Sequence, residues 1–204
     1  ASDVYKRQQY IQSSQKVGPS MADDIKNAAF LAVVFAMFCM AAYILLRFRD
    51  ISFSVGAFAS VAVTTLCIIS FYTLLWKVLP FSMEVDQTFI AAILTIIGYS
   101  INDTVVVFDR IRETIGLYPK RDRYQVINDA LNSTLSRTFN TSLTTLVVVL
   151  CIFILGGATI RSFTFAILLG IIIGTYSTLF VATPIAYELQ KKKINKKAAA
   201  EAGK

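Results

Sequence analysis

Five long apolar runs, separated by short polar segments, limit what this sequence can fold into more than any other feature. A membrane-spanning helix needs roughly 20 mostly apolar residues to cross a hydrocarbon core of about 30 Å. Five stretches meet that requirement, at residues 27–46, 53–78, 88–108, 138–155 and 163–187. Hydrophobic residues make up 55% of the chain and charged residues only 16%, which is not the composition of a soluble domain. The sequence therefore predicts an all-α integral membrane protein with five transmembrane helices.

The basic residues indicate how these helices are oriented. The formal charge is +7, but the positive side chains stand at the ends of apolar runs rather than on a continuous surface. The segments after the first, third and fifth runs contain many basic residues. The segments after the second and fourth runs contribute only Lys77 and Arg161. Because cytoplasmic segments are enriched in Lys and Arg, we expect an external N-terminus and a cytoplasmic C-terminus. The charge is thus interpreted as membrane topology, with no nucleic acid as partner.

The two ends of the chain differ from its middle. Residues 1–8 include Asp3-Val4-Tyr5-Lys6-Arg7-Gln8, which resembles a translated transposon end, and are expected to be non-native. Residues 9–26 are expected to be an external lead-in. Because no signal peptide precedes them, we expect an upstream helix to be missing. Residues 27–187 form the expected transmembrane domain, and 188–204 a basic cytoplasmic tail.

The cytoplasmic segment between the third and fourth runs has helical periodicity. Apolar residues recur within 123–136 at helical spacing, with Asn128 and Asp129 on the opposite face. The pattern predicts an amphipathic helix at the membrane surface. Such a helix is either a connector packed beneath the bundle or a site for a partner.

Asp103 is the most unusual residue of the chain, because it is an acid within an apolar run. It lies about 15 residues, or roughly 22 Å, from the outer end of the third run. A charge at such a depth costs at least ~2.5 kcal/mol, so it usually faces a partner or a water-filled cavity. Gly98, Ser100 and Asn102 on the same helix would let neighbours and water approach. We therefore expect Asp103 to carry function.

Arg137, at the inner end of the fourth run, is the candidate partner of this acid. It is followed by Asn140, Thr141 and Thr144, which place a polar stripe on one helix face. If the third and fourth helices are neighbours, Asp103 and Arg137 meet at similar depth. Two interpretations stay open: a proton relay in which the pair forms and breaks, or a static buried pair that fixes helix register.

The fifth run carries small residues at Gly170, Gly174 and Ser177. This spacing predicts close helix packing, although a close-packed surface would also allow sliding. The chain has no histidine, and its three cysteines are not paired in spacing, so no metal site, disulfide or other cofactor is indicated. Any proton relay must use carboxylates, hydroxyls and water.

The same residues carry a resemblance to the SecF family of bacterial protein-export subunits. The strongest match is the run Gly98-Tyr99-Ser100-Ile101-Asn102-Asp103-Thr104, continued by Phe108-Asp109-Arg110-Ile111-Arg112-Glu113. Shorter matches are Val17-Gly18-Pro19, Leu135-Ser136-Arg137-Thr138, and Gly170 through Gly174-Thr175-Tyr176-Ser177 to Pro184. The resemblance covers residues from about Val17 to Lys193 and implies five helices of a six-helix membrane domain of the resistance-nodulation-division type. It also implies that the first helix of this domain and an external domain are missing, from which residues 9–26 would lead in. The chain resembles either the C-terminal membrane region of SecF or the SecF half of a SecD–SecF fusion.

The resemblance also implies a function. The family uses the proton-motive force to help complete protein export across the bacterial inner membrane, with protons as the coupling ion. Asp103 and Arg137 match its intramembrane aspartate and arginine, and a further essential aspartate lies in SecD. The implied partners are SecD, the SecYEG channel, YajC-like subunits, a translocating polypeptide and membrane lipids. No enzymatic activity is implied.

Three other functions were weighed against this one. The first is half of a related proton-driven exporter of small molecules or lipids, which the missing external domain would distinguish. The second is an intramembrane aspartyl protease, which requires two carboxylates in one site. Asp109 follows Asp103 on the same helix by about a turn and a half, and no other span core offers a second acid. The third is a structural scaffold, for which Asp103→Asn would be harmless.

Overall fold

The computed structural model describes residues 19–79, 83 and 86–202, with side chains described within 27–79, 83, 86–157 and 160–196. The expected non-native residues 1–8 and the first part of the lead-in, 9–18, lie outside the described residues. All regular elements of the described part are helices: α2 (Pro19–Phe48), α3 (Ile51–Leu75), α4 (Gln87–Leu117), α5 (Arg123–Leu155), α6 (Ala158–Ser177), η1 (Thr178–Ala182) and α7 (Thr183–Ala202). The predicted all-α class is confirmed.

Five helices are long and apolar enough to cross a membrane, judged by length and composition. They correspond one to one with the five predicted runs, but several are longer than predicted. The helix expected at 88–108 continues to Leu117 and ends just before Tyr118-Pro119. Proline disfavours helical backbone at the residue that precedes it, here Tyr118, which explains why α4 ends there. The first helix begins at Pro19, where the missing amide costs nothing at a helix start.

The predicted amphipathic segment 123–136 is helical, but it is not a separate helix. It forms the first part of α5, which runs unbroken from Arg123 to Leu155. The Asp122 carboxylate starts the helix by accepting hydrogen bonds from the Tyr124 and Gln125 amides at 3.2 and 3.4 Å. Its position at a membrane surface stays a prediction.

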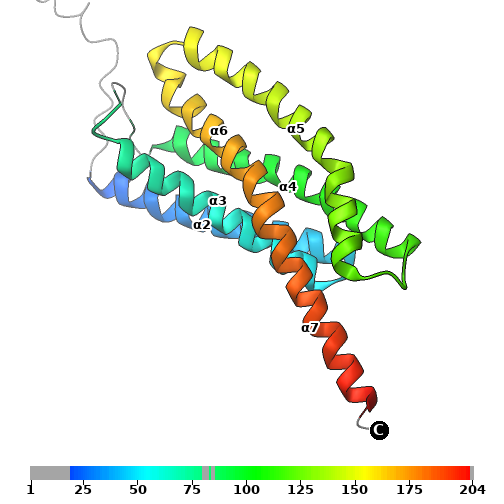
Figure 1. Cartoon of the computed structure of the whole chain (residues 1–204). Coiled ribbons are helices and arrows are strands. Elements are labelled where there is room, and N and C mark those ends of the chain that lie inside the picture. Colours follow the sequence, from blue (N-terminus) through cyan, green and yellow to red (C-terminus); the bar gives the residue numbers. More distant parts are fainter. Residues whose placement is uncertain (1–18, 80–82, 84–85, 203–204) are drawn as a thin grey trace, which may run out of the picture.

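The bundle is organised around α4, which packs against α2, α3, α5 and α6 (Figure 1). The rings of Phe48, Phe53 and Phe108 join α2, α3 and α4 at one end, with centroids 4.8 to 6.0 Å apart. The Tyr72 and Phe89 rings join α3 and α4 at the other end, 4.4 Å apart. Aromatic contacts thus join α3 and α4 at both ends, and α2 to them at one end.

The elements α6, η1 and α7 follow one another as a continuous rod, and α7 extends beyond the other helices (Figure 1). The π-helical turn η1 precedes Pro184, which has no amide hydrogen to donate within the helix. Here the Thr183 hydroxyl donates to the Thr178 carbonyl at 3.2 Å. The turn also contacts α3: a Cβ added at Gly56 of α3 would lie 2.6 Å from the Ala182 carbonyl oxygen of η1. The α3 backbone therefore rests directly on this turn.

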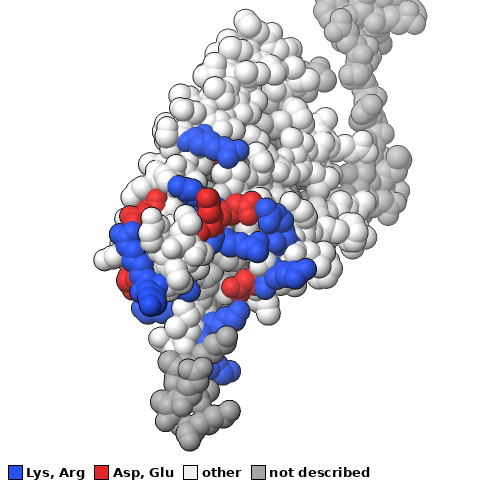
Figure 2. All heavy atoms as spheres, turned by 90° about the vertical axis from the view of Figure 1, so that its right-hand side faces the viewer, with Lys and Arg blue, Asp and Glu red and all other residues white. Residues whose placement is uncertain are grey.

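The surface of the bundle fits a membrane environment. Large apolar side chains such as Phe30, Phe35 and Phe38 are 65 to 74% exposed on α2. Acidic and basic side chains gather over one end of the face seen in Figure 2, while the rest of its described surface carries few charges. One pair at this end joins Arg47 to Asp109 at 2.9 Å. The chain is therefore a multi-pass membrane protein whose helices carry their charges mainly at one end.

Candidate functional site

Asp103 lies in the middle of α4, about 24 Å from the helix start at Gln87. Its side chain is buried, with 5% of the residue exposed. Thr104, the next residue, is also buried, and its hydroxyl lies 3.0 Å from the Thr178 hydroxyl of η1. The acid therefore faces the helices packed around α4 rather than the lipid.

Two hydroxyl groups connect Asp103 to the neighbouring helices. The Ser142 hydroxyl on α5 donates to Asp103 Oδ2 at 3.4 Å. The Ser142 and Thr175 hydroxyl oxygens are 2.7 Å apart, and Thr175 belongs to α6. Because serine has one hydroxyl hydrogen, Thr175 must donate to Ser142 while Ser142 donates to the carboxylate. We call Asp103, Ser142 and Thr175 the hydroxyl chain; it links α4, α5 and α6.

Arg137 does not form a direct ion pair with Asp103 within the described part of the chain. It is exposed, and it acts on the carboxylate only through its charge. Arg137 precedes Ser142 by five residues, which turns the two side chains apart by about 140° around α5. Since Ser142 faces Asp103, Arg137 faces away. Asp103 and Arg137, which were expected to meet at similar depth, therefore do not pair directly in this structure.

The other predicted polar residues fall into two groups. Ser100 is buried, and its hydroxyl has no hydrogen-bond partner in the structure. Asn102, Asn140 and Thr144 are exposed, and Thr141 is half-buried. The Thr141 and Thr144 hydroxyls donate to the carbonyls of Arg137 and Asn140, both at 2.9 Å. The stripe predicted on α5 is thus real, but it is directed outward.

The small residues of α6 are packed unequally. A Cβ at Gly170 would overlap the Ile96 side chain of α4, so this glycine lets the two helices approach closely. At Gly174 a Cβ would make ordinary contact with Ser100 at 3.5 Å. Ser177 is buried, and its hydroxyl donates to the Ser60 carbonyl at 2.9 Å. The contacts are those of tight packing at Gly170 and of hydrogen bonding at Ser177.

Residues 1–192 match the family model of the protein export membrane protein SecD/SecF, C-terminal. The chain belongs to the SecD/SecF family. A protein translocase subunit SecF from Rhodothermus marinus is 48% identical over 176 residues, covering 86% of this chain and 57% of that relative. A SecF from Petrotoga mobilis is 40% identical over 183 residues, covering 90% and 58%. The chain therefore spans a little over half the length of these SecF relatives, and the resemblance to SecF is confirmed.

Solved SecDF structures have the same arrangement of helices. The crystal structure of SecDF from Thermus thermophilus, a translocon-associated membrane protein, matches with a TM-score of 0.76 and 39% identity. It is covered over 23% of its length by 86% of this chain. SecDF in a super-membrane-facing form also gives a TM-score of 0.76, with 36% identity. The SecD/SecF membrane domain is therefore the fold of this chain.

Ser142 and Thr175 were missed as site residues by reasoning from the sequence. A hydroxyl residue in a membrane helix commonly bonds to its own backbone, as Thr141 and Thr144 do, so its presence alone identifies no site. The available signal was position: Ser142 adjoins the polar stripe, and Thr175 follows Gly174 in the motif shared with SecF. Only helix packing shows that Ser142 bonds to Asp103 and Thr175 bonds to Ser142.

Proposed function

We propose that this chain forms the membrane part of a SecF subunit that uses the proton-motive force to promote protein export through the Sec translocase. The observation that carries the proposal is the buried acid Asp103 at the end of the hydroxyl chain, in a family of protein export membrane proteins. An intramembrane acid held by partners is typical of a proton relay.

The hydroxyl chain supplies a mechanism, because its direction depends on the proton of Asp103. The ionised carboxylate only accepts, so Ser142 donates to it and Thr175 donates to Ser142. The protonated carboxyl group can itself donate to Ser142, which frees the Ser142 hydrogen for Thr175. Protonation therefore reverses both hydrogen bonds and changes how α5 is held between α4 and α6.

The proton-motive force is large enough to drive such a change. One elementary charge moving across 100 mV releases ~2.3 kcal/mol, which shifts a two-state equilibrium about fiftyfold. Arg137 contributes by its charge: when α5 turns, its guanidinium approaches the carboxylate and favours release of the proton. The resulting movement of the helices would be passed to an external domain that handles the polypeptide.

SecD is the proposed partner on the outward stripe. Asn102 on α4 and Arg137 and Asn140 on α5 are polar and exposed within spanning helices, where lipid contact is costly. A second membrane half would cover them, and SecD is suggested for this role because the solved structures similar to this chain are of SecDF. We further place the SecYEG channel and YajC-like subunits among the partners, and the charged end on the cytoplasmic side of the bacterial inner membrane.

Vesicles containing full-length SecF, SecD and the SecYEG channel test this function. After the ATP-driven motor has started export, the amount of protease-protected secretory protein is measured with and without an imposed proton gradient. We expect the gradient to increase protected product only when SecF and SecD are present. An equal increase without them, or none with them, would contradict the proposal.

A further inference from the structure

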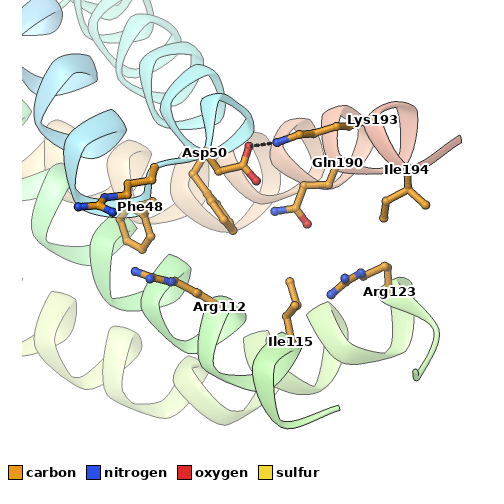
Figure 3. Close-up of a pocket in the computed structure, with 10 residues that line it drawn as sticks. Phe48, Asp50, Arg112, Ile115, Arg123, Gln190, Lys193 and Ile194 are labelled. Atoms are coloured by element: carbon orange, nitrogen blue, oxygen red, sulfur yellow. Dashed lines mark hydrogen bonds and ion pairs between the residues drawn. The ribbon is translucent and has the colours of Figure 1, made fainter. Parts of the chain in front are cut away.

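A cavity of about 310 Å³ opens at the charged end of the bundle, away from Asp103. It lies between the α2–α3 turn, the last turns of α4, the start of α5, and α7 (Figure 3). The spanning part of α2 ends at Phe48 and α3 begins at Ile51, so the cavity stands where spans end. This is the level at which lipid headgroups meet a membrane protein.

The polar wall of the cavity is strongly basic. Arg49, Arg112, Arg123 and Lys193 contribute four positive charges, and Asp50 contributes one negative charge. Asp50 Oδ1 already accepts from the Ser52 amide at 3.1 Å and lies 3.4 Å from Lys193 Nζ. The lining therefore has an excess of three positive charges, which favours an anion.

The three arginines have no acidic partner within the described part of the chain. Arg112 Nη1 reaches only the Arg47 carbonyl, at 3.5 Å. Arg123 Nη1 is buried without any hydrogen-bond partner, and Figure 3 shows this side chain directed into the cavity. A buried donor without a partner is rare in folded proteins and indicates a missing acceptor. A guanidinium pairs best with the oxygens of a phosphate or carboxylate.

The rest of the wall is apolar, and this favours a lipid over a free anion as the ligand. Phe48, Phe53, Ile115 and Ile194 line it beside the basic side chains. A small hydrated phosphate gains nothing from these side chains, whereas a phospholipid carries acyl chains attached to its phosphate through the glycerol. Basic cavities between membrane helices are suited to anionic headgroups for this reason.

We infer that this cavity binds the phosphate headgroup of an anionic phospholipid, with Arg112 and Arg123 as its main donors. A lipid bound there joins α4, α5, α7 and the α2–α3 turn, because each contributes part of the wall. The headgroup thereby holds the ends of α4 and α5, two of the helices joined by the hydroxyl chain deeper in the bundle.

Binding of defined lipids to the delipidated full-length protein tests this inference. Native mass spectrometry of the protein with its SecD partner counts the phosphatidylglycerol and phosphatidylcholine molecules retained, with inorganic phosphate as a third arm. We expect phosphatidylglycerol to bind in preference to phosphatidylcholine, and phosphate not to displace it. The double variant Arg112→Gln/Arg123→Gln should weaken binding of phosphatidylglycerol about 25-fold, since each basic residue contributes roughly fivefold.

A matched double variant, Arg110→Gln/Arg121→Gln, removes two arginines at the same end that already pair with Glu113 and Asp129. It should bind phosphatidylglycerol like the wild type. The single variant Arg123→Lys keeps the positive charge but loses the planar guanidinium, and should bind phosphatidylglycerol with intermediate affinity. If the double variant fails to fold, this single variant tests the inference instead. Equal retention of both lipids, equal loss in both double variants, or displacement by inorganic phosphate would each overturn the assignment.

Discussion

At the scale of single residues, Ser142 stands out because it bonds both to Asp103 and to a neighbouring helix. Ser142 is the only described side chain that donates to the carboxylate, and it also contacts Thr175 at 2.7 Å. Inside a membrane such polar chains are strengthened by the low dielectric constant and are costly to break in part. Ser142 therefore couples the acid to both neighbouring helices.

Ser142→Ala should lower the proton-driven rate of protein export roughly fivefold, as expected for loss of one hydrogen bond worth ~1 kcal/mol. The rate is measured in vesicles as protease-protected product under an imposed proton gradient. Thr145→Ala is the control, because the Thr145 hydroxyl donates only to the Thr141 carbonyl of its own helix. An unchanged rate for Ser142→Ala, or the same loss in the control, would show that the hydroxyl chain has no role.

Arg137 gives a second prediction at this scale, since it acts on Asp103 by charge and without a direct ion pair. A positive charge is retained in Arg137→Lys and removed in Arg137→Gln. We expect the lysine variant to keep most of the proton-driven export and the glutamine variant to lose it. If lysine were as defective as glutamine, the function of Arg137 would depend on guanidinium geometry instead.

The limits of prediction at the residue scale follow from this difference in chemistry. Asp103 could be found from the sequence because a charge within an apolar helix is costly wherever it points. Ser142 could not be found in that way, because a hydroxyl has a partner in its own helix. Arg137 was placed on the correct helix, but its direction depends on how α5 is rotated, which the pattern of polar residues alone did not determine.

At the scale of elements, close helix contacts depend on glycines whose roles differ. Gly56→Ala would bring a methyl group within 2.6 Å of the Ala182 carbonyl oxygen, part of the π-helical turn and unable to rotate away. We expect this variant to lose about 1–3 kcal/mol of stability. Gly174→Ala makes only contacts of 3.5 Å or more, and should be neutral or slightly stabilising.

Thermal unfolding of the purified full-length protein in lipid discs measures both glycine variants. The expected order of midpoints is Gly174→Ala at or above the wild type, and Gly56→Ala below it. A Gly56→Ala protein as stable as the wild type would mean that α3 and the turn η1 are not packed as described.

The lengths of the elements show what hydropathy can and cannot predict. All five spans were predicted because each is a long apolar run, and hydropathy measures such runs directly. The inner end of α4 was missed because the helix continues through polar residues to Leu117. The helix predicted at 123–136 was found, but hydropathy did not show that it continues into the fourth span as one helix, α5. The turn η1 was missed as well, since a proline at 184 predicts a kink or an end and not a π-helical turn.

At the scale of the whole molecule, the outward stripe of α5 is the proposed contact with SecD. A bulky side chain in a packed interface costs 1–3 kcal/mol, so Asn140→Phe should reduce the amount of SecD that co-purifies about fivefold or more. Val34 is exposed among large apolar residues on α2, so Val34→Phe should change nothing. Equal co-purification of SecD with both variants would place the SecD contact elsewhere.

The central claim of this account is that Asp103 carries the proton that drives export, and one substitution tests it most directly. Asp103→Asn keeps the size of the side chain but removes the ionisable carboxyl group, while Asp109→Asn makes the same change on the same helix at a residue paired with Arg47. Protease-protected product is measured in vesicles with SecD and the channel, under an imposed proton gradient and without one. The account predicts that Asp103→Asn abolishes the gradient-dependent part and leaves ATP-driven export intact, whereas Asp109→Asn keeps both. Gradient-driven export that continues unchanged in Asp103→Asn would contradict it.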